Sequence, residues 1–193
     1  GEEMGFKKGS SEYMWVLDPI DGTRALIAGV PVWTVLVSIN LKGEPILGIM
    51  YQPFTKELFI GGLGVSEVAR QGLVVSLDSS KCENLTDCIL FTTFPEIGSL
   101  GERSKFESVK KIVKLTRYGI DSYAYGLLAL GLIDVIIEAG LKSYDVLAPI
   151  SIVESAGGKV TDWTGGSAKN GGQVLATGNS VLHDKVLELM SMN

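Results

Sequence analysis

Two carboxylates follow an apolar run near the start of the chain. Asp18 ends the run, and Asp21 comes three residues later beside a glycine and a threonine. The run itself, residues 13–17, is aromatic and β-branched, which predicts a buried strand. Pro19 has no N–H for a ladder hydrogen bond, so we expect the strand to stop there. Asp18 then lies at the end of the strand, where open α/β sheets place their ligands.

Oxygen atoms of four residues converge in this stretch. Gly22 permits a turn with positive φ, and we expect Thr23 to cap a short helix that continues to residue 27. The two carboxylates, the carbonyl of Ile20 and the hydroxyl of Thr23 form an all-oxygen set. Such a set suits a hard divalent cation, Mg²⁺ first, and not zinc. For the motif by itself a structural interpretation stays open, because Asp-Pro and Asp-Gly pairs also form turns and caps.

Three further acidic residues have a related setting. Glu2 precedes the first strand and can reach its end through a loop. Glu138 ends an apolar stretch, residues 132–138, that predicts a second buried strand. Asp145 begins a predicted helix over residues 145–156, where a carboxylate also serves as a simple dipole-stabilising cap.

The elements that must position these residues form two patterns. Up to about residue 77 the sequence predicts an antiparallel meander, and beyond it strands alternate with helices, which indicates a layered α/β architecture with a mixed sheet. We expect a division into residues 1–80 and 81–193. The expected strands are 32–41, 45–51, 57–61, a hairpin within 65–77, 87–93, 115–118, 159–161 and 173–177, and the expected helices are 97–114, 122–130 and 180–192.

Composition narrows the class of protein. The chain has 193 residues, 46% of them hydrophobic, and a net charge of −5 without a basic cluster, which argues against nucleic-acid binding. No apolar run reaches transmembrane length, so we expect no membrane partner. Cys82 and Cys88 fit a reduced, cytoplasmic protein and have poor zinc spacing. The only histidine, His183, is predicted to be a surface helix residue. The first residues look like the middle of a longer protein, so we expect a fragment or a processed form.

Two motifs together resemble the inositol monophosphatase family of Mg²⁺-dependent, lithium-sensitive phosphatases. The first is W-[VI]-[LI]-D-P-I-D-G-T, which is intact at residues 15–23. The second is W-D-x-A…E-A-G-G, found at residues 144–158, and the family's G-E-E stands at residues 1–3. The resemblance covers essentially the whole chain. It implies the layered α/β sugar-phosphatase fold and a homodimer.

The resemblance also implies a ligand set and a reaction. Glu2, Asp18 and the carbonyl of Ile20 would bind one Mg²⁺, and Asp18, Asp21 and Asp145 a second, with two or three ions per site. Backbone N–H groups of Gly22 and Thr23 would meet the phosphate, and Thr23 would orient the attacking water. The implied activity is hydrolysis of a small phosphate monoester by metal-activated water. The catalytic residues are then Thr23, Asp18 and Glu2.

The substrate end of the site has its own pattern. The stretch R-Y-G-x-D-x-Y-A-Y at residues 117–125 is closer to the histidinol-phosphatase-like branch than to true inositol phosphatases. Asp121 and Glu138 would then bind the substrate, and an ammonium group would suit them, whereas inositol has none. The alternative that Asp121 caps the following helix stays equally open. Histidinol phosphate and inositol monophosphate are the leading substrates, ahead of fructose bisphosphate and nucleotide 3′-phosphates.

The sequence departs from the family pattern in three respects. Tyr144 replaces the usual Trp, and Pro149 stands early in a predicted helix, where it removes one backbone hydrogen bond. The family's N-terminal helical pair, which covers one side of the sheet, is missing. The alternative function is therefore a truncated, catalytically weak or inactive member of the family that binds metal or phosphate.

Overall fold

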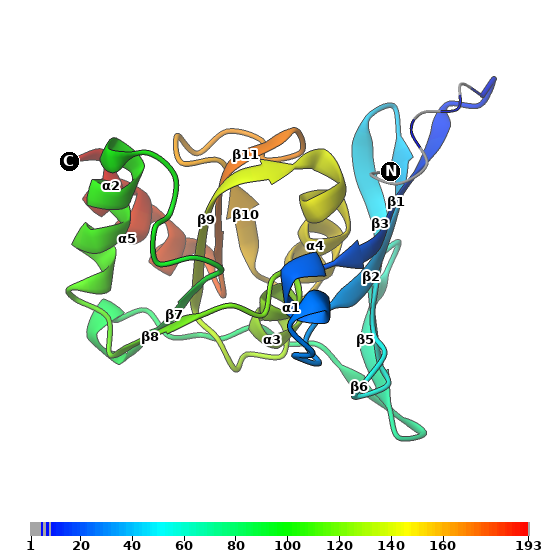
Figure 1. Ribbon diagram of the computed structural model, residues 1–193, viewed down its shortest axis with the longest axis horizontal. Coiled ribbons are helices and arrows are strands. Elements are labelled where there is room, and N and C mark those ends of the chain that lie inside the picture. Colours follow the sequence, from blue (N-terminus) through cyan, green and yellow to red (C-terminus); the bar gives the residue numbers. More distant parts are fainter. Residues whose placement is uncertain (1–4, 6, 8, 193) are drawn as a thin grey trace.

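Six antiparallel strands in chain order form the first sheet, at the right of Figure 1. The computed structural model describes residues 5, 7 and 9–192. Short turns join successive strands, so each strand pairs with the one before it, as the hairpin signals in the sequence predict. The strands are β1 (Tyr13–Asp21), β2 (Thr34–Leu41), β3 (Glu44–Gln52), β4 (Glu57–Gly62), β5 (Val65–Arg70) and β6 (Leu73–Ser76).

The second sheet has five strands in the order β10-β11-β9-β7-β8. Strand β7 runs parallel to both β8 and β9, and the other pairs are antiparallel. The predicted mixed sheet is confirmed, but its central strand β9 starts later and runs further than expected, so that Glu138 lies within it. The strands are β7 (Ile89–Thr92), β8 (Leu115–Tyr118), β9 (Val135–Lys142), β10 (Lys159–Thr161) and β11 (Gly171–Thr177).

The helices make two further layers (Figure 1). Helices α3 and α4 lie between the sheets, and α2 and α5 cover the other face of the second sheet. The order is therefore sheet, helices, sheet, helices, which is the layered α/β fold that the sequence predicts. The helices are α1 (Thr23–Ile27), α2 (Leu100–Lys110), α3 (Tyr123–Ala129), α4 (Ser143–Ser155) and α5 (Ser180–Ser191), with a 3₁₀ turn at Leu85–Asp87.

Helix α4 packs against both sheets. Ile152 joins the core formed with the first sheet, while Ile150 and Val153 belong to the core formed with the second. The backbone of α4 comes so close to β3 that a Cβ added at Gly48 would lie 2.1 Å from the carbonyl oxygen of Ala148. Only glycine permits that approach. The parts before and after residue 80 thus share a core, and their division into domains stays a prediction.

Strand β1 corrects two expectations. It does not stop at Pro19, because the register with β2 shifts between Asp18 and Asp21, and within this bulge Pro19 need not donate a ladder hydrogen bond. Nor is the strand buried, since Trp15 is 62% exposed and Tyr13 54%. No element of the described part of the chain covers that face of the first sheet. An apolar run fixes a strand but not whether a second layer covers it.

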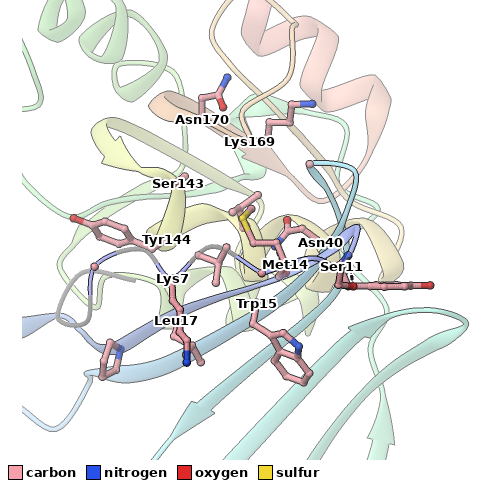
Figure 2. Close-up of a pocket in the computed structure, with 17 residues that line it drawn as sticks. Lys7, Ser11, Met14, Trp15, Leu17, Asn40, Ser143, Tyr144, Lys169 and Asn170 are labelled. Carbon is pink, nitrogen blue, oxygen red and sulfur yellow. Dashed lines mark hydrogen bonds between the residues drawn. The ribbon is translucent and has the colours of Figure 1, made fainter.

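A hollow of about 880 Å³ lies beside β1 (Figure 2). Trp15 and Leu17 line it from the strand, and Ser143 and Tyr144 from the start of α4. It is larger than the cavity described below, but the carboxylates of Asp18, Asp21 and Asp145 do not line it. No helix among the described residues is long and apolar enough to cross a membrane.

His183 is not the surface residue that the sequence suggested. Its side chain is 0% exposed and hydrogen-bonds Thr161 Oγ1 at 2.8 Å and Thr177 Oγ1 at 2.9 Å through its two ring nitrogens. Burial, followed by the positive charge of Lys159, lowers the pKa of His183 to about 4. Threonines on β10 and β11 therefore bind the imidazole of His183. The sequence of α5 alone does not indicate this, because the partners lie on other elements.

We expect His183 to make stability depend on pH. The unfolded chain binds a proton near pH 6.5 and the folded chain only near 4, so this contribution is complete above pH 6.5 and is lost as the pH falls towards 4. The full effect is on the order of 3 kcal/mol. Urea unfolding at several pH values should give a flatter dependence between pH 4 and 6.5 for His183→Gln than for the wild type. Equal slopes would contradict the assignment.

Candidate metal centre

The bulge at the end of β1 turns two carboxylates towards the interior. Asp18 is only 2% exposed and accepts a hydrogen bond from the N–H of Ile20 at 3.2 Å. Asp21 accepts one from the N–H of Ser122 at 2.7 Å, which ties β1 to the beginning of α3. The hydroxyls of Ser122 and Thr34 are hydrogen-bonded at 2.5 Å and reinforce that link. The position of the Asp21 carboxylate therefore depends on Ser122, which lies about a hundred residues away in the sequence.

Helix α1 begins at Thr23, but Thr23 does not cap it. The N-cap is Gly22, which has φ of +86°, and no side chain caps the helix. A Cβ at Gly22 would lie 3.1 Å from Asp121 Oδ2 and 3.3 Å from the Cα of Trp33, so both the turn and the crowding require glycine. The predicted cap is wrong by one residue, and the hydroxyl of Thr23 is not used in capping.

Asp145 completes the cluster from the third position of α4. It accepts a hydrogen bond from the N–H of Lys142 at 2.7 Å, as first-turn carboxylates do. Ligand oxygens of Asp18, Asp21 and Asp145 all lie within 4.8 Å of one another. Because the cluster offers only carboxylate oxygen, it fits a hard divalent cation such as Mg²⁺ and not a soft one.

The other predicted metal ligands have different outcomes. Ile20 lines the same cavity as the three carboxylates, and its role through the carbonyl stays a prediction. Glu2 lies outside the described residues, so its proposed place in the site is not tested. The cavity has a volume of about 300 Å³, and Gly22 and Thr23 also line it.

Glu138 lines the same cavity. It is buried on β9 and accepts hydrogen bonds from both the N–H and the hydroxyl of Thr93, each at 2.7 Å. Burial raises the pKa of Glu138 to about 7, although these hydrogen bonds act in the opposite direction. The parallel pairing of β7 with β9, in which Leu90 is opposite Val135, carries Thr93 to Glu138.

Asp121 faces the cavity as well. Its backbone has φ of +44°, and its carboxylate makes no hydrogen bond to the N-terminus of α3, so the alternative that Asp121 is a helix cap is not supported by the described contacts. Burial, and then the charge of Asp21, raise the pKa of Asp121 to about 6, while Arg24 lowers it. A nearby cation stabilises the charged form of such a carboxyl group, which burial otherwise disfavours.

The sequence did not single out three residues at the cavity. Thr93 holds Glu138, and the guanidinium of Arg24 lies 4.6 Å from the centroid of the Phe94 ring, a cation–π contact at the rim. Thr93 is the last residue of the predicted strand over 87–93, and Phe94 follows it directly. Their position at the end of a strand could have indicated a place in the site. That inference requires knowing that the strand lies parallel to β9, which the sequence does not show.

Cys82 and Cys88 form a second group with Asp134, whose candidate ligand atoms lie within 4.8 Å of one another. Both cysteines are free thiols, with their Sγ atoms 3.4 Å apart. Burial raises the pKa of the Cys88 thiol far above its usual range, which disfavours the thiolate that a metal needs. Asp134 accepts hydrogen bonds from Ser80 Oγ and from the N–H of Ile89, and so caps the entry to β7.

The protein is thus a four-layer α/β protein with a carboxylate cluster that fits a hard divalent cation. Residues 1–192 match the inositol monophosphatase family. The chain belongs to that family. A solved structure of an inositol monophosphatase from Zymomonas mobilis, 35% identical, superposes with a TM-score of 0.88 over 99% of this chain and 74% of that one. The predicted family and fold are confirmed.

Two relatives match almost the whole of this chain. A bifunctional phosphatase IMPL2, chloroplastic, from Arabidopsis thaliana is 42% identical over 199 residues, covering 97% of this chain and 57% of that protein. A histidinol-phosphatase from Mycobacterium tuberculosis is 30% identical, covering 97% of this chain and 73% of its own length. The chain thus spans little more than half of the Arabidopsis relative.

We expect Mg²⁺ to stabilise the folded chain through Asp145. An ion at 100 times its Kd adds about 2.7 kcal/mol to the free energy of unfolding. Asp145→Asn should abolish this Mg²⁺-dependent rise in melting temperature without lowering the metal-free value, because it relieves repulsion among three carboxylates. Differential scanning fluorimetry with Mg²⁺ and with chelator measures both.

Glu102→Gln is the matched control. Glu102 stands at the same position of α2 and accepts the N–H of Ser99 at 2.6 Å, so it shares the capping role but not the cluster. The control should keep the full response to Mg²⁺. A full response in Asp145→Asn would remove Asp145 from the ligand set.

Proposed function

We propose that this chain carries the active site of a Mg²⁺-dependent phosphomonoesterase for small phosphate monoesters. The observation that carries the proposal is the convergence of Asp18, Asp21 and Asp145 from β1 and α4 within 4.8 Å. Membership of a phosphatase family supports the reaction class. The chain covers 57% of the Arabidopsis relative, so the activity of the whole protein is part of the proposal.

Different residues would hold the metal ions and orient the attacking water. Asp18 and Asp21, with Asp145 and the carbonyl of Ile20, would hold two or three Mg²⁺ ions, and Glu2 is the further predicted ligand. When bound, Mg²⁺ lowers the pKa of a coordinated water and offsets charge on the phosphoryl oxygens. The hydroxyl of Thr23, which no capping bond occupies, would orient the attacking water.

Phosphate would be held at the turn into α1. The backbone N–H groups of Gly22 and Thr23 would bind it, since both residues line the cavity and Gly22 makes the turn after β1 with a left-handed conformation. Glycine at this position also leaves room for Asp121 close by. Loss of Gly22 would therefore disturb the phosphate site and the substrate end together.

For the alcohol portion of the substrate we propose Asp121 and Glu138. A half-buried and a buried carboxyl group, both with raised pKa values, favour a substrate that brings a positive charge, such as the ammonium group of histidinol phosphate. Relatives named for either substrate match the chain, among them an inositol-1-monophosphatase from Caulobacter vibrioides at 30% identity. Inositol monophosphate is therefore the second substrate to test.

A non-catalytic role is the candidate from another class. Several relatives at 31–34% identity are named Nus factor SuhB, which is not the name of an enzyme. A member that binds metal or phosphate without turnover would keep the cluster and lose hydrolysis. We further propose a homodimer and a cytoplasmic location, although the Arabidopsis relative is named chloroplastic.

Phosphate release from a panel of monoesters tests the proposed activity. Histidinol phosphate, inositol 1-phosphate and fructose 1,6-bisphosphate should be compared with Mg²⁺ and with chelator, and release should require Mg²⁺. Asp18→Asn should lower kcat by at least about a thousandfold with the fold intact, since it removes a charge shared by two ions. Asp184→Asn, at an exposed ion pair with Lys159, is the matched control. Mg²⁺ binding without release from any ester would favour the non-catalytic role.

Asp121→Asn tests the substrate class. A hydrogen bond to a charged group contributes about 1.5–3 kcal/mol, so kcat/KM for histidinol phosphate should fall roughly 10- to 100-fold. The value for inositol 1-phosphate should change far less. Because the pKa of Asp121 is about 6, the wild-type preference for the amine-bearing ester should also weaken as the pH falls below 6. Equal losses on both esters would show that Asp121 does not contact the amine.

A further inference from the structure

Tyr125 carries a buried hydroxyl group beneath the metal centre. The residue lies on α3, one turn after Ser122, and is 2% exposed. Its hydroxyl has no hydrogen-bond partner among the described residues. Buried phenol groups usually find a partner, so this one calls for an explanation.

Tyr125 lines a small cavity together with four acidic residues. The cavity has a volume of about 30 Å³, and Asp21, Asp121, Glu138 and Asp145 line it together with Tyr125. The acidic groups can accept hydrogen bonds, while the phenol can donate one. Burial and the charges of Glu138, Asp21 and Asp145 raise the pKa of Tyr125 well above its usual value, so it stays protonated. Thr93, Ser122 and Leu141 complete the lining, and the hydroxyls of Thr93 and Ser122 already have partners, so the phenol is the donor left beside several carboxylate acceptors.

A water molecule fits this arrangement in size and in chemistry. A buried water needs roughly 10–15 Å³ of space for its centre, and the cavity offers about 30 Å³, so it has room for a water, which makes two to four hydrogen bonds. A water could accept from Tyr125 and donate to two of the carboxylates. Asp21 comes from β1 and Asp145 from α4, so one such water would join the two elements that supply the cluster.

We propose that Tyr125 holds one buried water between the carboxylates of β1 and α4, and is thereby a positioning residue for the metal centre. The inference rests on the part of the proposed function that assigns Mg²⁺ to this cluster. Outer groups that orient ligands typically change metal affinity 10- to 100-fold when removed. Because Tyr125 acts only through other residues, we expect its loss to change Mg²⁺ affinity by an amount at the lower end of that range.

Tyr125→Phe is the test, and Tyr123→Phe is its matched control on the same helix. Tyr123 donates its hydroxyl hydrogen to Glu57 Oε2 at 2.5 Å, away from the cluster. Calorimetric titration with Mg²⁺ in the absence of substrate should show roughly tenfold weaker binding for Tyr125→Phe. Tyr123→Phe should bind Mg²⁺ like the wild type and have a lower melting temperature.

Activity and structure provide the second readout. The Mg²⁺ concentration at half-maximal phosphate release should rise for Tyr125→Phe and stay unchanged for Tyr123→Phe, and high Mg²⁺ should restore the former. Crystal structures of wild type and Tyr125→Phe should show a water against the tyrosine hydroxyl that is lost or displaced in the variant.

The outcomes separate this inference from the proposed function. Weaker Mg²⁺ binding in Tyr125→Phe, with no wild-type hydrolysis of any ester, would support the water and reject the phosphatase. Wild-type hydrolysis with unchanged Mg²⁺ binding in Tyr125→Phe would do the reverse. A change confined to KM for the amine-bearing ester would also overturn the inference, because the hydroxyl would then contact substrate. Failure of the wild type to bind Mg²⁺ would reject both.

Discussion

Repulsion among like charges is the constraint on which the rest of this structure depends. The ligand oxygens of Asp18, Asp21 and Asp145 lie within 4.8 Å of one another, and Asp18 is buried. Charges of one sign at such distances repel strongly where little water separates them. Backbone N–H groups of Ile20, Ser122 and Lys142 offset part of that repulsion. A divalent cation would offset the remainder, so the geometry and the proposed cofactor depend on each other.

The cluster also requires that its elements cannot move apart. Helix α4 is held from both sides, since Ile152 packs towards the first sheet and Val153 towards the second. Its close contact with β3 at Gly48 fixes its height above the sheet that also carries Asp18. Close-packed layers transmit displacements and do not absorb them. Packing far from the cavity therefore controls the spacing of the carboxylates.

The two ends of the cavity use burial differently. Asp18, Asp21 and Asp145 each accept a backbone hydrogen bond, while at Asp121 and Glu138 burial outweighs the other influences and raises the pKa values. Glu138 would be raised further without Thr93, whose N–H and hydroxyl both donate to it. Arg24 supplies the nearby positive charge, stacked on Phe94.

The amino-acid sequence by itself determined the family, the strands of the first sheet and the three clustered aspartates. The strands and the pair Asp18 and Asp21 follow from local chemistry, because the D-P-I-D-G-T motif, alternating apolar residues and turn signals act over a few positions. The family and the place of Asp145 followed from the resemblance that two motifs carry together. Only the tertiary structure decided that β1 is exposed, that His183 is buried and that Thr93 and Tyr125 belong to the site. Each of these depends on a partner far away in sequence, such as β9 beside β7 or α3 beneath β1. Periodicity shows that a strand or helix has two faces, but the strand order and the layer packed on top decide which face is covered.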